Sequence, residues 1–75
     1  MNGWKNWETW NAALWIGNDE SLYRQVIGLL NSKVTTWSAV SLCLIAQFGE
    51  KTEDGAFWAD ADEAEMNNFL SDLID

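Results

Sequence analysis

The sequence predicts an all-α fold, a compact single domain over residues 1–75 with about four helices. Three observations predict it. Apolar residues recur every three or four positions over most of the chain, helix-capping residues separate these periodic segments, and no segment alternates convincingly as a strand does. Six tryptophans supply bulk for a core, so a chain this short does not need a disulfide to fold.

The first predicted helix begins at Trp7, with Asn6 as its N-cap, and ends at the Gly17-Asn18-Asp19 sequence, where the next helix starts. A helical wheel places Trp7, Trp10 and Leu14 on one arc. This apolar arc is expected to face the core.

The second predicted helix runs from about Asp19 to Ser32. Gly28 lies inside it, where a glycine costs up to about 1 kcal/mol relative to alanine, and we expect it to mark the close approach of a neighbouring helix. The expected apolar stripe consists of Leu22, Val26, Leu29 and Leu30, with Tyr23 and Ile27 beside it.

The third predicted helix starts after a cap at Thr35 or Thr36, runs to about Phe48 and stops at Gly49. Its polar surface is small, so we expect it to be the most thoroughly buried helix. The apolar residues that support this expectation are Trp37, Val40, Leu42, Cys43, Leu44, Ile45 and Phe48.

The last predicted helix begins at Asp60, because Glu63 follows three residues later as in a capping box. A polar connection precedes it, and the Phe57-Trp58 pair in that connection must dock onto the helices. A short extended segment is compatible with residues 55–59. The apolar stripe of the last helix is Met66, Phe69, Leu70, Leu73 and Ile74.

The net charge of −8 comes entirely from the last third of the chain, since residues 1–49 are neutral. Such a field repels nucleic acid and anionic membranes and attracts basic surfaces. We therefore expect neither direct nucleic-acid binding nor a membrane partner. Against the single base Lys51, residues 50–75 hold the acids Glu50, Glu53, Asp54, Asp60, Asp62, Glu63, Glu65, Asp72 and Asp75.

The composition argues against an enzyme, a metal site or a bound cofactor. The chain has no histidine to act as a base or a zinc ligand. Cys43, the single cysteine, lies in an apolar run where a thiol is inert. The acids after Asp60 fail the calcium-loop pattern at Ala64 and Glu65, so only weak adventitious calcium binding, or a small calcium-responsive module, remains as a minor alternative.

The tryptophans near the N-terminus have two interpretations. Trp7 and Trp10 are expected in the core, whereas Trp4 and Trp15 stay open as contacts for a partner. Asn11 lies within the apolar arc and must find hydrogen bonds there. We expect it to clamp the first helix to the Phe57-Trp58 connection.

The acidic last third also has two interpretations, between which the sequence does not decide. It is either a solvated surface that keeps an aromatic-rich protein soluble or an acidic surface that binds a basic groove and mimics nucleic-acid phosphates. In the second interpretation the acidic contacts are Glu53, Asp54, Asp60, Asp62, Glu63 and Glu65, and the apolar anchors are Trp4, Trp15 and Trp58.

The segment NWETWNAALWIGNDESLY at residues 6–23, with the later Asp54-Gly55 and Trp58, resembles a family of small phage, prophage and plasmid proteins that begin with an NWETWNxxLWIxND block. The family has no settled activity, so the resemblance implies an accessory protein of a mobile element. Small acidic proteins of such elements often inhibit host systems, anti-CRISPR and antirestriction proteins among them.

The charge and the resemblance together predict a non-enzymatic protein in the cytoplasm of the host cell, monomeric or weakly self-associating. Its expected partner is a host protein with a basic surface, such as a component of a CRISPR or restriction system. The alternative is a structural module that forms homo-oligomers through exposed tryptophans, with the acids serving solubility only.

Overall fold

The computed structural model describes residues 3–74, and the all-α prediction is confirmed. The elements are α1 (Trp7–Asn18), α2 (Glu20–Asn31), α3 (Trp37–Phe48), the 3-10 helix η1 (Trp58–Asp60) and α4 (Glu63–Leu73). The extended segment compatible with residues 55–59 is reduced to one antiparallel bridge between Lys51 and Phe57, because the chain coils into η1 directly afterwards.

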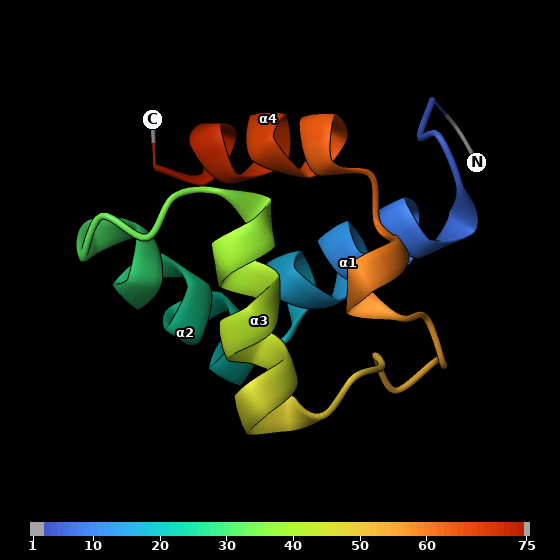
Figure 1. Ribbon diagram of the computed structural model, residues 1–75, viewed down its shortest axis with the longest axis horizontal. Coiled ribbons are helices and arrows are strands. Elements are labelled where there is room, and N and C mark those ends of the chain that lie inside the picture. The colour runs from blue at the N-terminus through green and yellow to red at the C-terminus, as the bar shows by residue number, and fades with distance from the viewer. Residues whose placement is uncertain (1–2, 75) are drawn as a thin grey trace.

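The helices surround one core, as Figure 1 shows. α4 lies along one side of the molecule and contacts both α1 and α3, and α2 packs against α1 and α3. The segment between α3 and η1 returns along the opposite side and brings η1 against α1 and α3 (Figure 1). Of the helices within residues 3–74, none is both long enough and apolar enough to cross a membrane.

Each α-helix starts with a side-chain oxygen that accepts a hydrogen bond from the backbone N–H three residues later. The predicted cap at Asn6 is confirmed, and of the two candidates Thr35 and Thr36 the cap is Thr36. Asp19, where the second helix was expected to start, is its cap. Gly49 ends α3 with a φ of 93°, a conformation that favours glycine.

The predicted start of the last helix at Asp60 is wrong. Asp60 is the final residue of η1, and Ala61 after it has an extended backbone, with φ −70° and ψ 140°. An α-helix therefore cannot begin before Asp62, whose carboxylate caps the backbone N–H of Glu65.

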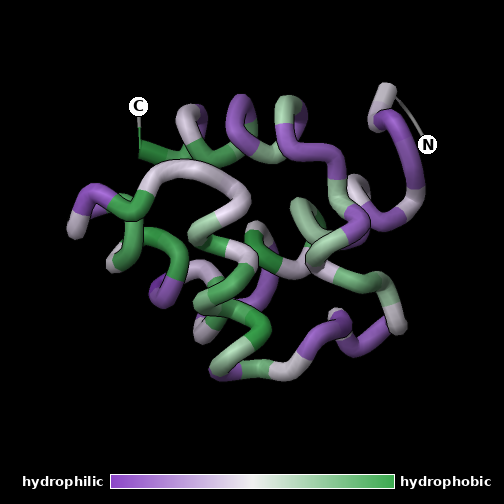
Figure 2. The backbone as a smooth tube through the Cα atoms, viewed as in Figure 1, coloured by the Kyte–Doolittle hydropathy of each residue, from purple (hydrophilic) through white to green (hydrophobic). Residues whose placement is uncertain are grey.

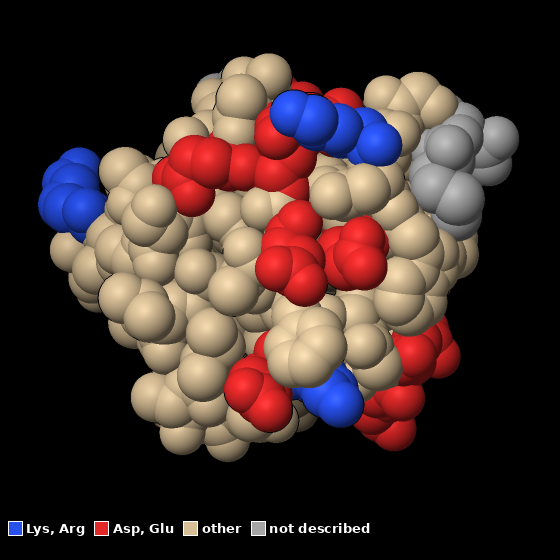
Figure 3. All heavy atoms as spheres, turned by 45° about the vertical axis from the view of Figure 1, so that its right-hand side comes forward, with Lys and Arg blue, Asp and Glu red and all other residues tan. Residues whose placement is uncertain are grey.

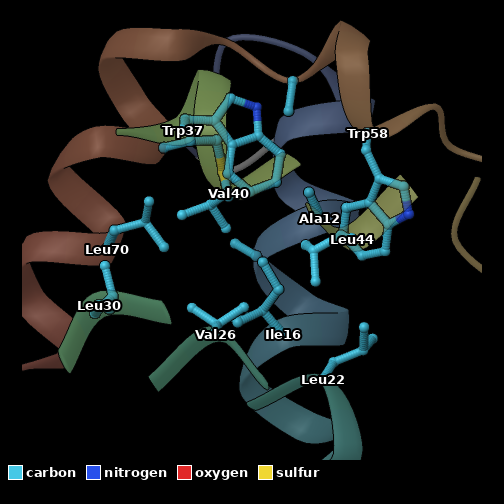
Figure 4. Packing of buried hydrophobic residues seen from close by; sticks show 13 residues of the cluster. Ala12, Ile16, Leu22, Val26, Leu30, Trp37, Val40, Leu44, Trp58 and Leu70 are labelled. Atoms are coloured by element: carbon cyan, nitrogen blue, oxygen red, sulfur yellow. The ribbon is translucent and has the colours of Figure 1, made fainter. Parts of the chain in front are cut away.

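The core is built around two tryptophans, Trp37 and Trp58, whose rings lie 6.2 Å apart between centroids. Figure 4 shows them over the aliphatic side chains of the surrounding helices. The predicted docking of the Phe57-Trp58 pair is confirmed only for Trp58, which is 1% exposed. Phe57 is 38% exposed and lies under Lys51 Nζ instead. The aliphatic part of the core comprises Ile16, Leu22, Val26, Leu30, Val40, Leu44, Met66 and Leu70.

The predicted inner face of α1 is wrong. Trp7 and Leu14 are 36% and 37% exposed, and Trp10 is half-buried. The residues of α1 that face the core are Thr9, Asn11, Ala12, Ala13 and Ile16. Mostly small side chains point inward because α1 packs against η1, which carries the bulky Trp58.

The prediction that α3 is the most thoroughly buried helix is also wrong. Leu42 is 67% exposed, Phe48 is 43% exposed and Cys43 is half-buried. The buried residues are Trp37, Val40, Ser41 and Leu44, which mark the face toward α2, α4 and η1. Figure 2 colours much of the α3 backbone as hydrophobic, and some of these residues, Leu42 and Phe48 among them, are exposed.

Gly28 does not mark a close helix contact, contrary to the sequence-based expectation. It is exposed, and a Cβ atom built on it would meet nothing within 4 Å. We expect Gly28→Ala to raise the free energy of unfolding by about 0.5–1 kcal/mol, because alanine loses less backbone entropy in a helix. Urea denaturation measures this gain. Gly49→Ala is the opposing control and should destabilise, because of its positive φ.

Candidate functional site

The acidic connection between α3 and η1 is fastened to α1 through Asn11, which is 1% exposed. Asn11 Nδ2 donates to Asp54 Oδ2 at 2.9 Å, and Thr52 Oγ1 donates to Asn11 Oδ1 at 2.6 Å. Thr52 Oγ1 also accepts from the backbone N–H of Ala56 at 3.0 Å. The predicted clamp is confirmed, although its partners are side chains of the connection and not backbone groups.

Trp15 joins the same contact. Its Nε1–H donates to Asp54 Oδ2 at 2.9 Å, so the polar edge of this half-buried indole is already occupied. The hydrogen bonds from Asn11 and then Trp15 lower the pKa of Asp54. Asp54 is therefore an ionised carboxylate held in a defined position at neutral pH.

The first turn of α4 is fastened to the first turn of α1. The backbone N–H of Asp62 donates to Thr9 Oγ1 at 2.8 Å, and that hydroxyl donates to Asn6 Oδ1. The Lys5 N–H donates to Glu65 Oε1 at 2.7 Å, and Lys5 Nζ lies 3.3 Å from Asp62 Oδ1. The backbone N–H of Glu65 lowers the pKa of Asp62 most, followed by Lys5.

Glu63 contacts the first turn of α3. Its Oε2 accepts from the backbone N–H of Ser38 at 3.1 Å, and its Oε1 accepts from Ser38 Oγ at 3.0 Å. A carboxylate in this position also interacts favourably with the positive end of the helix dipole. Glu63 thus helps to hold α3 and α4 together.

The six acids predicted as contacts therefore differ in role. Four of them, Asp54, Asp62, Glu63 and Glu65, stabilise the fold through side-chain hydrogen bonds. The side chains of Glu53 and Asp60 have no hydrogen bond or ion pair within residues 3–74, and both residues are exposed. Asp60 takes part only through its backbone: its carbonyl oxygen accepts from Asn6 Nδ2 at 3.3 Å, and its N–H donates to the carbonyl oxygen of Phe57 at 3.1 Å.

The structure brings these acids to the side of the molecule where the connection, η1 and the start of α4 meet. Figure 3 looks onto this side and shows acidic side chains spread over it, with basic side chains toward its edges. We call this surface the acidic face and define it as Glu53, Asp54, Asp60, Asp62, Glu63 and Glu65.

The predicted anchor Trp58 is not accessible, because its side chain is buried between α1 and α3 as part of the core. Trp4 is half-buried and packs edge-to-face on Phe69 of α4, with centroids 6.4 Å apart. A shallow hollow of about 200 Å³ lies there, lined by Trp4, Phe69, Trp10, Ala13 and Leu14.

A larger cavity of about 370 Å³ lies at the junction of α1 and α2, beside the end of α3. Trp58 forms part of its wall, and its buried Nε1–H has no hydrogen-bond acceptor within the described chain. An unpaired buried donor of this kind costs roughly 1–3 kcal/mol. The cavity is lined by Trp15, Asp19, Ser21, Leu22, Phe48, Lys51, Thr52, Glu53 and Trp58.

Sequence reasoning missed this cavity because its residues come from three separate segments of the chain. Phe48 was expected in the core and Asp19 only at the start of the second helix, and no local pattern connects either of them with Glu53. Within residues 3–74 no group of three or more His, Cys, Asp or Glu residues is arranged to hold a metal ion.

Comparison with known proteins leaves the function open. No curated protein matches the chain, and no solved structure matches it. One family model, described as a family of unknown function (DUF7249), matches residues 1–75.

Proposed function

The chain belongs to the DUF7249 family, whose description assigns no activity, so we propose a function from its surface. We propose that it is a non-enzymatic protein that binds a basic surface of another protein through the acidic face. The observation that carries the proposal is the concentration of negative charge. The net charge of −8 arises in residues 50–75, and the acidic face presents much of it on one side of the molecule. Such a field attracts basic partners and repels nucleic acid.

The hydrogen bonds within the acidic face support this proposal. Asp54 and Asp62 are held by neighbouring groups that lower their pKa, so both stay charged in fixed positions. A charged group that is already immobile loses little conformational entropy when a partner binds. A rigid array of carboxylates is suited to occupy a groove that normally holds nucleic-acid phosphates.

The proposed context is a mobile genetic element. The NWETWN block resembles small phage, prophage and plasmid proteins, and small acidic proteins from such elements often inhibit host systems. We therefore propose a nucleic-acid-binding protein of the host as the partner, such as a component of a CRISPR or restriction system, with inhibition as the result.

Asp60→Lys tests the proposal, because Asp60 carries charge on the acidic face and its side chain makes no contact that the fold needs. We expect tagged protein to retain a host partner at roughly 50 mM salt and to lose it at roughly 500 mM, since salt screens exposed charges. Asp60→Lys should lose that partner at low salt, whereas a partner retained by this variant would contradict the proposal.

Asp72→Lys is the matched control. It makes the same change in charge near the end of α4, about 10 Å along the helix from Glu65, the nearest acidic-face residue of that helix. Asp72 lies outside the acidic face, so its charge acts on a docked partner only through the long-range field, which salt screens. Binding should therefore survive Asp72→Lys, and equal losses in the two variants would mean that only the net charge matters.

Homo-oligomerisation is the second candidate function, favoured by the exposed apolar side of α1. Trp7 and Leu14 share this side with the half-buried Trp10. Sedimentation at about micromolar concentration, the range of common weak interfaces, separates the candidates. A dimer that Leu14→Glu dissociates would support the second candidate, and a monomer would support the first.

A further inference from the structure

The cavity of about 370 Å³ opens beside the acidic face and shares Glu53 with it. Its size falls in the lower range of protein pockets that bind small ligands, which is roughly 300–1,000 Å³. It is therefore large enough to accept one long side chain from a partner. Its walls come from the end of α1, the start of α2, the end of α3, the connection and the first residue of η1.

The lining combines aromatic rings with carboxylates. Trp15 and Phe48 belong to the walls, and Phe48 is 43% exposed. Asp19 uses Oδ1 to cap α2, while Oδ2 has no hydrogen-bond partner in the described residues. Glu53 is exposed and likewise has no partner there for its carboxylate. Aromatic faces beside carboxylates favour a cation with a flat or apolar body.

Lys51 also lines the cavity, but its ammonium group is engaged elsewhere. Lys51 Nζ lies 4.9 Å from the ring centroid of Phe57, and Phe57 is not part of the cavity wall. Within residues 3–74 Lys51 therefore forms no ion pair with the carboxylate of Asp19 or Glu53. The charge at the cavity remains complementary to a basic side chain.

Trp58 provides an observation independent of the acids. It lines the cavity and is 1% exposed, and its Nε1–H is the buried side-chain donor that lacks an acceptor in residues 3–74. Figure 4 shows this nitrogen on the edge of the ring that is turned away from the aliphatic core. A carbonyl oxygen from an occupant of the cavity would satisfy this donor.

We propose that the cavity receives an arginine side chain of the partner protein. The guanidinium group stacks on Trp15 and Phe48 and pairs with Asp19 and Glu53, and a main-chain carbonyl of the same segment accepts from Trp58. Arginine fits better than lysine because its planar group stacks on aromatic rings and forms paired hydrogen bonds to carboxylates. This inference rests on the proposed function, since it names one contact of that partner.

The test uses N-acetyl-arginine N-methylamide as the probe, with the intact protein labelled with ¹⁵N. We expect the probe to shift the indole N–H resonances of Trp15 and Trp58 saturably in NMR spectra. The uncharged analogue with citrulline in place of arginine should bind at least about tenfold more weakly, because a tenfold loss corresponds to one charged hydrogen bond. The lysine analogue should bind between the two.

Glu53→Gln should weaken binding of the arginine probe about tenfold, the loss expected for one charge-assisted hydrogen bond. Glu50→Gln is the matched control, since Glu50 lies in the same connection but does not line the cavity, and it should leave binding unchanged. Phe48→Leu keeps an apolar wall, removes the aromatic face and should also weaken binding. Equal shifts with arginine and citrulline, or no shift at Trp58, would overturn the inference.

The results also separate the inference from the proposed function. If the probe does not bind but capture of the partner still depends on Asp60, the arginine site is wrong and the acidic face stands. If the probe binds as expected but Asp60→Lys keeps its partner, the arginine site is supported and docking through the acidic face is wrong.

Discussion

Replacing Asn11 with alanine is expected to lower the free energy of unfolding by about 3 kcal/mol, the range for losing hydrogen bonds to a charged group and leaving buried partners unpaired. Asn11 is buried and joins Asp54 and Thr52 to α1. Thermal unfolding followed by circular dichroism should show a melting temperature lower by roughly 12–24 °C for a domain of this size.

The control for this experiment is Asn18→Ala. Asn18 lies on the same helix, but it is exposed and donates only to the carbonyl oxygen of Leu14 at 3.0 Å. Its replacement should cost at most about 0.5 kcal/mol. A double-mutant cycle of Asn11→Ala with Asp54→Ala then isolates the interaction energy of that pair. If Asn11→Ala and Asn18→Ala cost the same, the connection is not held by Asn11.

Thr9→Val is expected to destabilise the protein by about 2 kcal/mol, because valine fills the same volume but leaves a nearly buried backbone donor without its acceptor. The hydroxyl of Thr9 is fully buried and accepts from the backbone N–H of Asp62 at 2.8 Å. Urea denaturation measures the loss. The dependence of the free energy of unfolding on urea concentration should be the same as in the wild-type protein if the substitution changes only stability.

Two further variants decide whether the hydroxyl of Thr9 is responsible. Thr9→Ser keeps the hydroxyl and loses only a buried methyl group, which costs about 1 kcal/mol. Thr35→Val changes an exposed threonine and should be nearly neutral. A loss in Thr9→Ser as large as that in Thr9→Val would show that packing, and not the hydrogen bond, holds α1 to α4.

The two networks explain much of the tryptophan-rich block near the N-terminus. Asn6 and Thr9 attach the start of α4 to α1, and Asn11 and Trp15 attach the acidic connection. The polar residues of the block are therefore mainly structural. Their effect on the proposed function is indirect, since they hold the carboxylates of the acidic face in place.

The helices could be predicted from the sequence because their determinants are local. The caps at Asn6, Asp19 and Thr36 act on residues three positions away, and the stop at Gly49 depends on its own backbone conformation. The start of α4 was misplaced by two residues, since both Asp60 and Asp62 are suitable capping residues. Only the turn of η1 excludes Asp60, and that turn follows from the docking of Trp58.

The faces of the helices were harder to predict. α1 carries two apolar arcs, one with Trp7 and Leu14 and one with Ala12 and Ile16, and hydrophobicity alone favours the first. The structure buries the second because the neighbouring Trp58 needs small side chains opposite it. The space available to a side chain depends on both elements that meet at a contact. The buried face of α1 therefore cannot be predicted from the sequence of α1 alone.

By itself the sequence determined the helical class, the starts of the first three helices, the concentration of negative charge in the last third and the need for Asn11 to find buried partners. Only the tertiary structure decided which acids hold the fold and which have side chains that are exposed and unpaired within residues 3–74, as those of Glu53 and Asp60 are. It also decided that Trp58 is buried, and it assembled the cavity from Trp15, Phe48 and the connection. The physical reason is distance along the chain, because caps act within one turn, whereas hydrogen bonds such as that between Asn11 and Asp54 join residues 43 positions apart.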